Sequence, residues 1–116
     1  MKYLTHNKKE DIDVGDTSLI ECIHVFYDTL VQIFGKPMKG YDKSDAEWWI
    51  EFEDGTVSTI YNYKDGKNYL GKNGMKTKDI TYWHIGGLNQ KSYDYVIEAI
   101  KNKNREKKLE RIVKDA

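Results

Sequence analysis

The stretch AEWWIEFEDGTVSTIYNY, residues 46–63, decides the fold because it predicts a β-hairpin. Its Asp54-Gly55 pair is the dipeptide favoured in a two-residue type I′ turn, where both central residues need a positive φ angle. Aromatic and β-branched residues flank the pair on both sides, which is typical of strands. We therefore expect the two flanks to pair as antiparallel strands.

The turn also predicts the register of the hairpin, and with it the face on which each side chain lies. With a two-residue loop, Phe52 faces Val57 and Trp49 faces Ile60. One face is then suited to the core and carries Trp48, Ile50, Phe52, Val57, Thr59 and Tyr61. The other face carries polar residues together with Trp49 and Ile60, a pair that we expect to be covered by the protein or to contact a partner.

A helix is predicted ahead of the hairpin, from residues 16–18 to Phe34. Ser18 and Glu21 have the spacing of a capping box. At about 100° per residue, one broad face is apolar and suited to the core. This face carries Leu19, Ile20, Ile23, Phe26, Tyr27, Leu30, Val31, Ile33 and Phe34. Gly35 is placed to take the left-handed conformation that commonly ends a helix.

After the hairpin, residues 64–79 are predicted as a long loop with two turns. Long loops in compact domains are often functional. Lysines in such a loop can attract an anionic partner, and tyrosines can stack on one. The candidate binding residues are Lys64, Lys67, Tyr69 and Lys72 in this loop, together with Tyr63 directly before it.

A third strand is predicted at Ile80–Ile85, and its two faces both carry apolar side chains. The sheet is therefore expected to be covered or docked on both sides. Gly86 and Gly87 follow and are expected to form a tight turn. Because glycines let backbone N–H groups approach an anion at a helix N-terminus, this turn could also cradle a phosphate. His84, just before it, is a further candidate binding residue.

A final helix is expected to begin near Asn89 or Ser92. Its first apolar stripe, suited to pack on the sheet, is Tyr93, Val96, Ile97 and Ile100. A second stripe points in nearly the opposite direction and consists of Leu109, Ile112, Val113 and Ala116. A straight helix cannot lay both stripes on one sheet, so the chain breaks near residues 102–104, or the tail frays, or its stripe contacts another molecule. The simplest contact is a homodimer through Leu109, Ile112 and Val113.

These elements predict an α+β fold with a helix, a three-stranded antiparallel sheet made of the hairpin and one strand, and a C-terminal helix. Residues 1–116 are expected to form a single domain. Within it, residues 1–16 are an N-terminal arm or short edge strand and residues 101–116 a basic C-terminal tail. The sequence has no apolar run long enough to cross a membrane and no signal-like N-terminus, so we expect a cytoplasmic location.

The formal net charge of zero hides an asymmetry. Residues 1–58 hold 6 basic and 12 acidic residues, whereas residues 59–116 hold 13 basic and 7 acidic residues. The basic excess lies in residues 64–78 and 101–114. These segments could attract phosphates, nucleic acid or an acidic protein face, or they could be ordinary solvated surface.

The sequence contains no set of residues with the spacing of a catalytic or metal site. Cys22 is expected to be a small buried residue rather than a nucleophile. The three histidines are scattered, and the carboxylates of Asp42, Asp45 and Glu47 have no visible pocket that would separate their pKa values. We therefore expect no enzymatic activity, no metal and no cofactor.

Several of these stretches together resemble a known type of protein. FGKP, DGTVSTIYNY and WHIGG are similar to segments of small accessory proteins of tailed phages and prophages. The resemblance implies a phage origin and the order helix, three strands, helix, and it carries over no catalytic residue. It also implies that the protein blocks a host system, because such proteins often inhibit restriction, CRISPR or nucleotide-signalling defences.

The leading hypothesis is therefore a non-enzymatic inhibitor, for example an anti-CRISPR or anti-restriction protein, that binds a host protein in the cytoplasm of an infected or lysogenic bacterium. The alternative is a binder or sponge of a nucleotide or another phosphorylated ligand. Nucleic acid is a weaker candidate partner, and no membrane contact is expected. The candidate binding residues for either function are Trp49, Ile60, Tyr63, Lys64, Lys67, Tyr69, Lys72, His84, Gly86 and Gly87.

Overall fold

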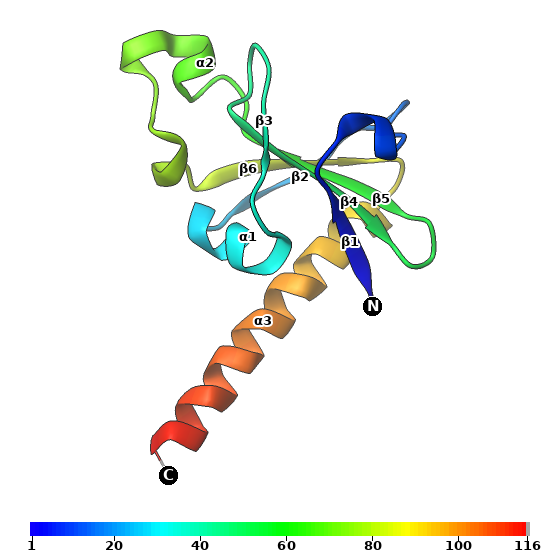
Figure 1. Cartoon of the computed structure of the whole chain (residues 1–116), viewed down its shortest axis with the longest axis vertical. Coiled ribbons are helices and arrows are strands. Elements are labelled where there is room, and N and C mark those ends of the chain that lie inside the picture. The colour runs from blue at the N-terminus through cyan, green and yellow to red at the C-terminus, as the bar shows by residue number, and fades with distance from the viewer. Residues whose placement is uncertain (116) are drawn as a thin grey trace.

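The computed structural model describes residues 1–115 and contains one antiparallel sheet with α1 and α3 on one of its faces (Figure 1). The sheet has six strands in the order β1-β4-β5-β6-β2, with the short β3 paired to β4. The strands are β1 (Tyr3–His6), β2 (Ser18–His24), β3 (Met38–Lys39), β4 (Ala46–Phe52), β5 (Val57–Tyr61) and β6 (Tyr82–Gly87). The helices are α1 (Tyr27–Phe34), α2 (Lys67–Leu70) and α3 (Lys91–Asp115), with 3₁₀ turns at Lys9–Asp11, Gly71–Asn73 and Thr77–Asp79. The α+β class is as predicted, but the sheet has six strands instead of three.

The core lies between the sheet and the two helices and is centred on two tryptophans. Trp48 on β4 and Trp83 on β6 meet edge to face, with ring centroids 5.2 Å apart. Trp48 Nε1 donates to the carbonyl of Gly35 at 2.7 Å, and Trp83 Nε1 donates to that of Val25 at 3.1 Å. Both indoles are thus buried without an unpaired donor. The other large, fully buried apolar side chains are Leu30, Ile50, Ile60, Ile80, Ile85 and Val96.

The predicted hairpin forms between β4 and β5, but its predicted loop is one residue too short. Phe52 N–H donates to Thr56 O at 2.8 Å, and Gly55 N–H donates to Phe52 O at 2.9 Å. The loop is therefore Glu53-Asp54-Gly55, and Gly55, with φ of 88°, takes the left-handed conformation. A three-residue loop that ends on a left-handed glycine is the next commonest hairpin after the two-residue type.

The longer loop leaves the faces of β4 as predicted and exchanges those of β5. Trp48 pairs with Ile60, and Trp49 pairs with Thr59. Ile60 is fully buried beside Ser58 on the core face, so the predicted patch of Trp49 and Ile60 does not form. The side chains that move from the predicted core to the opposite face are Val57, Thr59 and Tyr61.

The helix predicted over residues 16–34 is wrong in its first half. That half is the edge strand β2, which pairs antiparallel with β6, and only the second half is helical, as α1. The register of β2 shifts between Leu19 and Glu21, so a bulge interrupts the two-residue alternation that marks a strand. Pairing with a distant strand overrides the local helical periodicity.

Two other boundaries agree with the predictions. Gly35 ends α1 with φ of 85°, and its N–H donates to Val31 O at 2.8 Å. The N-terminal arm contains the short edge strand that was one of its two expected forms, because β1 pairs with β4 at the margin of the sheet.

Gly86 and Gly87 lie inside β6, so the predicted turn at these residues is wrong. Both glycines are buried and pair with β2, and Gly86 also pairs with Thr59 on β5. A Cβ atom on Gly87 would collide with the side chain of Ser92 at the start of α3. Ser92 Oγ is held there by donating to Val57 O at 2.7 Å. Because both glycines are part of the sheet, they form no loop that could cradle a phosphate.

The helix α3 is continuous, so the break predicted as one alternative at residues 102–104 is absent. Its first half packs on β5, β6 and β2, and its second half projects beyond the rest of the molecule (Figure 1). Leu109, Ile112 and Val113 are 61%, 56% and 74% exposed on the projecting half. The second apolar stripe is thus helical and uncovered within the described residues, and Ala116 lies outside them.

Candidate binding surface

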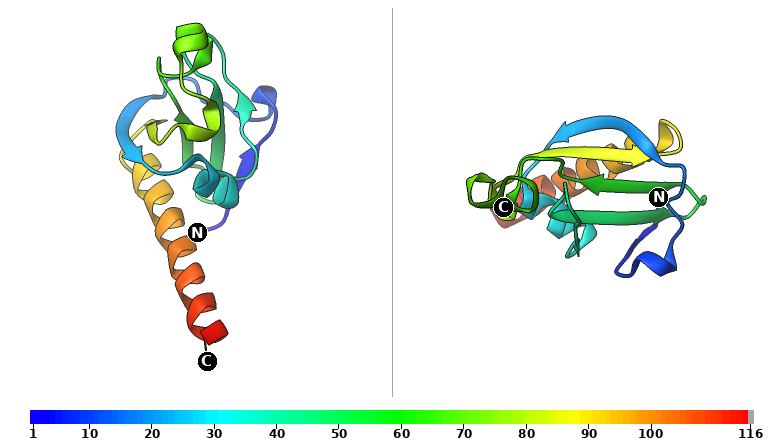
Figure 2. Two further views of the ribbon diagram at one scale, coloured as in Figure 1. Left: turned by 90° about the vertical axis from the view of Figure 1, so that its left-hand side faces the viewer. Right: turned by 90° about the horizontal axis from the view of Figure 1, so that it is seen from above.

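Neither α1 nor α3 covers the second face of the sheet, which we call the outer face. The right-hand view of Figure 2 looks onto it, with α3 behind the strands. Tyr61 on β5 lies opposite His84 on β6. On the other side of β6, Cys22 lies opposite His84 and His24 lies opposite Tyr82. Strands that are far apart in the sequence therefore bring aromatic side chains together on this face.

Five rings gather on the outer face and form what we call the aromatic cluster: His24, Tyr61, Tyr63, Tyr82 and His84. The ring of His84 is central, with centroids 5.4 Å from Tyr63, 5.5 Å from Tyr61 and 5.6 Å from Tyr82. The rings of His24 and Tyr82 are 4.8 Å apart. These separations are those of favourable tilted and edge-to-face aromatic pairs.

Three members of the aromatic cluster, His84, Tyr61 and Tyr82, have pKa values shifted toward their neutral forms. Burial lowers the pKa of His84, and the nearby carboxylate of Asp65 opposes this shift only in part. Burial also raises the pKa of Tyr61. The pKa of Tyr82 is raised mainly by its hydrogen bond with Cys22. The cluster therefore offers ring faces and neutral hydrogen-bonding groups to a partner.

A buried asparagine ties the loop of residues 62–75 to the body of the protein beside the aromatic cluster. Asn62 Oδ1 accepts the N–H groups of Asp45 at 2.7 Å and of Ala46 at 3.1 Å. Its Nδ2 donates to the carboxylates of Asp45 and Asp65, each at 2.9 Å. Both lone pairs and both protons of the amide are thus used. This network fixes the start of the loop.

Further contacts close the loop on itself. The second carboxylate oxygen of Asp45 accepts the N–H of Asn68 at 3.1 Å. Gly66 is needed beside it, because a Cβ atom at this position would collide with the Asp45 carboxylate. Met75 N–H donates to Asp65 O at 2.9 Å. The loop is therefore held at both ends by hydrogen bonds and presents a fixed surface.

Lys64 lies between two exposed tyrosines of this loop. Its Nζ is 5.2 Å from the ring centroid of Tyr63 and 5.4 Å from that of Tyr69, both within cation–π range. The two rings are 42% and 47% exposed. Lys64 also has φ of 62°, a left-handed conformation that is uncommon for a residue with a Cβ atom. Asp16 and Asp42 share this conformation, but aspartate adopts it more readily than lysine does.

The structure brings together four of the predicted binding residues, namely Tyr63, Lys64, Tyr69 and His84. Lys67 and Lys72 are exposed on the same loop. Trp49 lies on the outer face of β4, where the Nζ of Lys9 is 5.3 Å from its ring centroid. The remaining three predicted binding residues are buried in the sheet: Ile60, Gly86 and Gly87.

Sequence reasoning missed Tyr61, Tyr82 and His24 as members of the candidate site. The short-loop register placed Tyr61 in the core, and the predicted helix removed His24 from the sheet. A three-residue loop at residues 53–55 would have moved Tyr61 to the outer face. The position of His24 has no comparable local signal, because it depends on the pairing of β2 with β6.

Two further features are absent from the described residues. Within residues 1–115, no three His, Cys, Asp or Glu side chains gather where they could hold a metal ion. In the same part of the chain, no helix has the length and apolar character needed to cross a membrane. The outer face and the loop present aromatic rings, hydroxyl groups, lysine ammonium groups and the exposed carboxylate of Glu51, and all of these are suited to binding.

No protein family model matches the chain, and no curated protein matches it. The resemblance to small phage proteins therefore stays a hypothesis. The candidate site is interpreted from its own geometry.

Proposed function

We propose that the protein binds another protein through the aromatic cluster and the loop of residues 62–75, and that it acts by occupying its partner's surface without catalysis. The observation that carries this proposal is Lys64 held between the exposed rings of Tyr63 and Tyr69. Tyrosine is enriched at binding hot spots because it offers a large contact area at a low cost in side-chain entropy. A loop that is already ordered by Asn62 lowers the entropic cost of binding further.

In this proposal the partner belongs to a bacterial host and the protein is its inhibitor. The resemblance to accessory proteins of tailed phages supports this choice. It directs the search first to host defence systems, such as CRISPR and restriction enzymes.

Affinity capture with tagged variants tests the proposal. Wild-type protein should retain a specific host protein, and a Tyr63→Ala, Tyr69→Ala variant should lose it by about tenfold or more in affinity. Both tyrosines are nearly half exposed, so the melting temperature should change little. Leu88→Ala is the control, because Leu88 is 62% exposed and follows the opposite end of β6 from Tyr82. Equal binding by the double variant and the control would rule out this surface.

A phosphorylated small ligand is the second candidate, and the position of Lys64 between two rings is the observation that favours it. A base or sugar could stack on Tyr63 or Tyr69 while the ammonium group binds a phosphate. Thermal melting with a panel of nucleotides tests this directly. A ligand at 100 times its Kd should add about 2.7 kcal/mol of stability. No shift with any nucleotide would leave the protein partner as the remaining proposal.

A further inference from the structure

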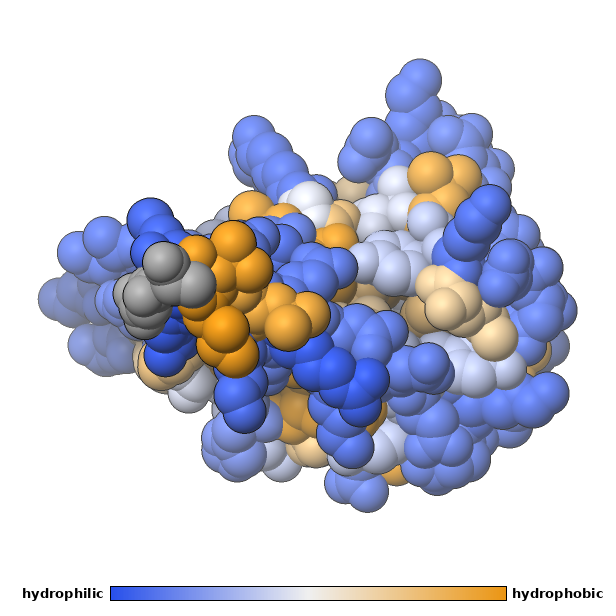
Figure 3. Space-filling view, turned by 90° about the horizontal axis from the view of Figure 1, so that it is seen from below, coloured by the Kyte–Doolittle hydropathy of each residue, from blue (hydrophilic) through white to orange (hydrophobic). Residues whose placement is uncertain are grey.

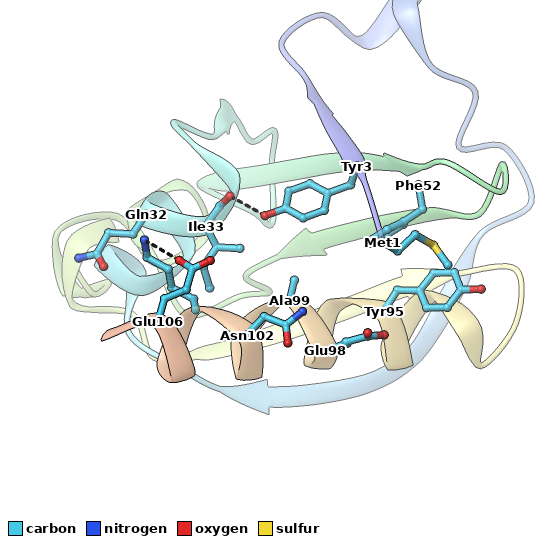
Figure 4. Close-up of a pocket in the computed structure, with 11 residues that line it drawn as sticks. Met1, Tyr3, Gln32, Ile33, Phe52, Tyr95, Glu98, Ala99, Asn102 and Glu106 are labelled. Carbon is cyan, nitrogen blue, oxygen red and sulfur yellow. Dashed lines mark hydrogen bonds and ion pairs between the residues drawn. The ribbon is translucent and has the colours of Figure 1, made fainter. Parts of the chain in front are cut away.

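The first half of α3 borders a groove of about 260 Å³ on the helical side of the molecule (Figure 4). Its apolar lining comes from four elements and the N-terminus: Met1, Tyr3, Ile33, Phe52, Tyr95 and Ala99. Polar side chains of α3, among them Glu98 and Glu106, form one rim. Met1 and Tyr3 are 49% and 38% exposed in it. The groove is thus lined by apolar and polar side chains together and is open to a second molecule.

The second half of α3 carries the matching apolar surface. Leu109, Ile112 and Val113 are each more than half exposed. Figure 3 views the molecule from below and shows apolar atoms gathered beside the C-terminal end of the helix. Contiguous apolar side chains on a projecting element commonly mark an interaction site.

The groove and two residues of the stripe, Leu109 and Val113, lie on the same side of α3. Tyr95 and Val113 are 18 residues apart, which is about five turns, so they project in the same direction. Asn102 on the groove and Leu109 on the stripe are 7 residues apart and differ by only about 20°. Leu109 and Val113 therefore continue the helical wall of the groove toward the C-terminus, whereas Ile112 lies about 100° away around the helix.

We propose that a second copy of this chain occupies the groove, with the two α3 helices antiparallel. Leu109 of each copy then lies against Ala99 of the other, and Val113 lies near Tyr95. A parallel pair would place Leu109 against Leu109 and leave both grooves open. In a two-fold dimer, the stripe of each copy fills the groove of the other, so every contact occurs twice. Both occurrences add to the buried surface area, which is roughly 800 Å² per partner in a standard interface.

The charges beside the stripe agree with the antiparallel arrangement. Lys103 and Glu106 lie on the same side of α3, where they contact each other at 3.7 Å within one chain. With Leu109 opposite Ala99, Arg105 is the residue directly opposite Lys103, and Glu106 of the other copy lies one residue further along the helix. In an antiparallel pair of identical helices, the same flank of each helix lies beside that of the other. The side chains of Lys103 and Glu106 from both copies therefore lie along one edge of the interface. The antiparallel register therefore leaves Lys103 of each copy within reach of Glu106 of the other.

Light scattering of the full-length chain over a range of concentrations tests the proposal. The wild type should have the mass of two chains, and a Leu109→Glu, Val113→Glu variant should have half that mass. Both residues are exposed, so the variant should fold normally. Arg111→Gln, Lys114→Gln changes the net charge equally, lies on the opposite side of the same helical segment, and should remain dimeric. A monomeric wild type, or a dimeric Glu variant, would overturn the proposal.

Cross-linking distinguishes the direction of the helices. In a Cys22→Ser background, an Ala99→Cys, Leu109→Cys variant should form a covalent dimer with a short bis-maleimide. Leu109→Cys alone should not, because the two Leu109 positions are far apart in an antiparallel pair. Efficient cross-linking of the single variant would show a parallel pair, and no cross-linking of the double variant would show a different interface. Either result would overturn the antiparallel arrangement.

Discussion

Asn62 is the residue on which the position of the loop depends. It is fully buried, and its amide makes four hydrogen bonds. Asn62→Ala leaves the N–H groups of Asp45 and Ala46 without their acceptor, so the free energy of unfolding should fall by about 1–3 kcal/mol in urea denaturation. Asn73→Ala, an exposed position on the same loop, should change it by less than about 0.5 kcal/mol. Equal effects would mean that the network does not hold the loop.

His84 gives the outer face a pH dependence of known sign. Burial lowers its pKa below the ordinary value of 6.5, so the unfolded chain binds the proton more readily than the folded chain. The stability contributed by the neutral ring is present above pH 6.5 and is lost as the pH falls through the lower pKa of the folded state. Between about pH 7 and 5, the wild type should therefore lose more unfolding free energy than His84→Gln. An NMR titration of His84 with a midpoint above 6.5 would contradict this.

Among the elements, the hairpin has a register that can be tested by two truncations on β5. Ile60 is fully buried, whereas Val57 lies on the outer face and is half-buried. Ile60→Ala should cost about 2–5 kcal/mol of unfolding free energy, and Val57→Ala about 1 kcal/mol or less. The two-residue loop would reverse this order, so chemical denaturation of the two variants decides between the registers.

The elements that could be predicted are those whose signal is local. The alternation of Trp48, Ile50 and Phe52 marks the core face of β4 whatever the length of the hairpin loop. Gly35 ends α1 because glycine readily adopts a positive φ angle, which is a local property. The strand β2 could not be predicted, because its bulge hides the alternation and its partner β6 lies far along the chain. The register of β5 failed because Asp-Gly suits both a two-residue and a three-residue loop.

The candidate site could be predicted only where it is contiguous in the sequence. Lys64 and Tyr69 lie in one predicted loop and Tyr63 directly precedes it, and the lysine and aromatic content of this segment was a sufficient signal. His84 joins them only through the pairing of β5 with β6. Asn62, which anchors the loop through Asp45, has no signal in the sequence, because its role depends on a contact between segments that are 17 residues apart.

In the whole molecule, the two proposed contact surfaces are separate. The aromatic cluster lies on the outer face of the sheet, and the groove lies on the face that carries α3. The projecting helix contributes to a long dimension of 48 Å, against 36 Å and 23 Å for the other two. A dimer through α3 therefore leaves both outer faces free, and variants at one surface should not alter the contacts at the other.

The charge asymmetry of the chain has a kinetic consequence for the loop. Lys67 and Lys72 are exposed and are not held between rings as Lys64 is, so their charges act on an approaching partner through solvent. For a partner with an acidic surface, Lys67→Glu, Lys72→Glu should slow association by about tenfold at low ionic strength and change dissociation little. The difference should shrink near 1 M salt, where the Debye length falls to about 3 Å.

The control for this measurement makes the same change in net charge at the far end of α3. Arg111→Glu, Lys114→Glu should slow association less than the loop variant, because these charges lie on the projecting helix and away from the proposed contact. Stopped-flow or surface-based association rates at several salt concentrations provide the comparison. If both variants slow association equally, net charge rather than the position of the loop lysines governs the encounter. If the wild-type rate does not change with salt, the partner surface that approaches the loop carries no acidic excess.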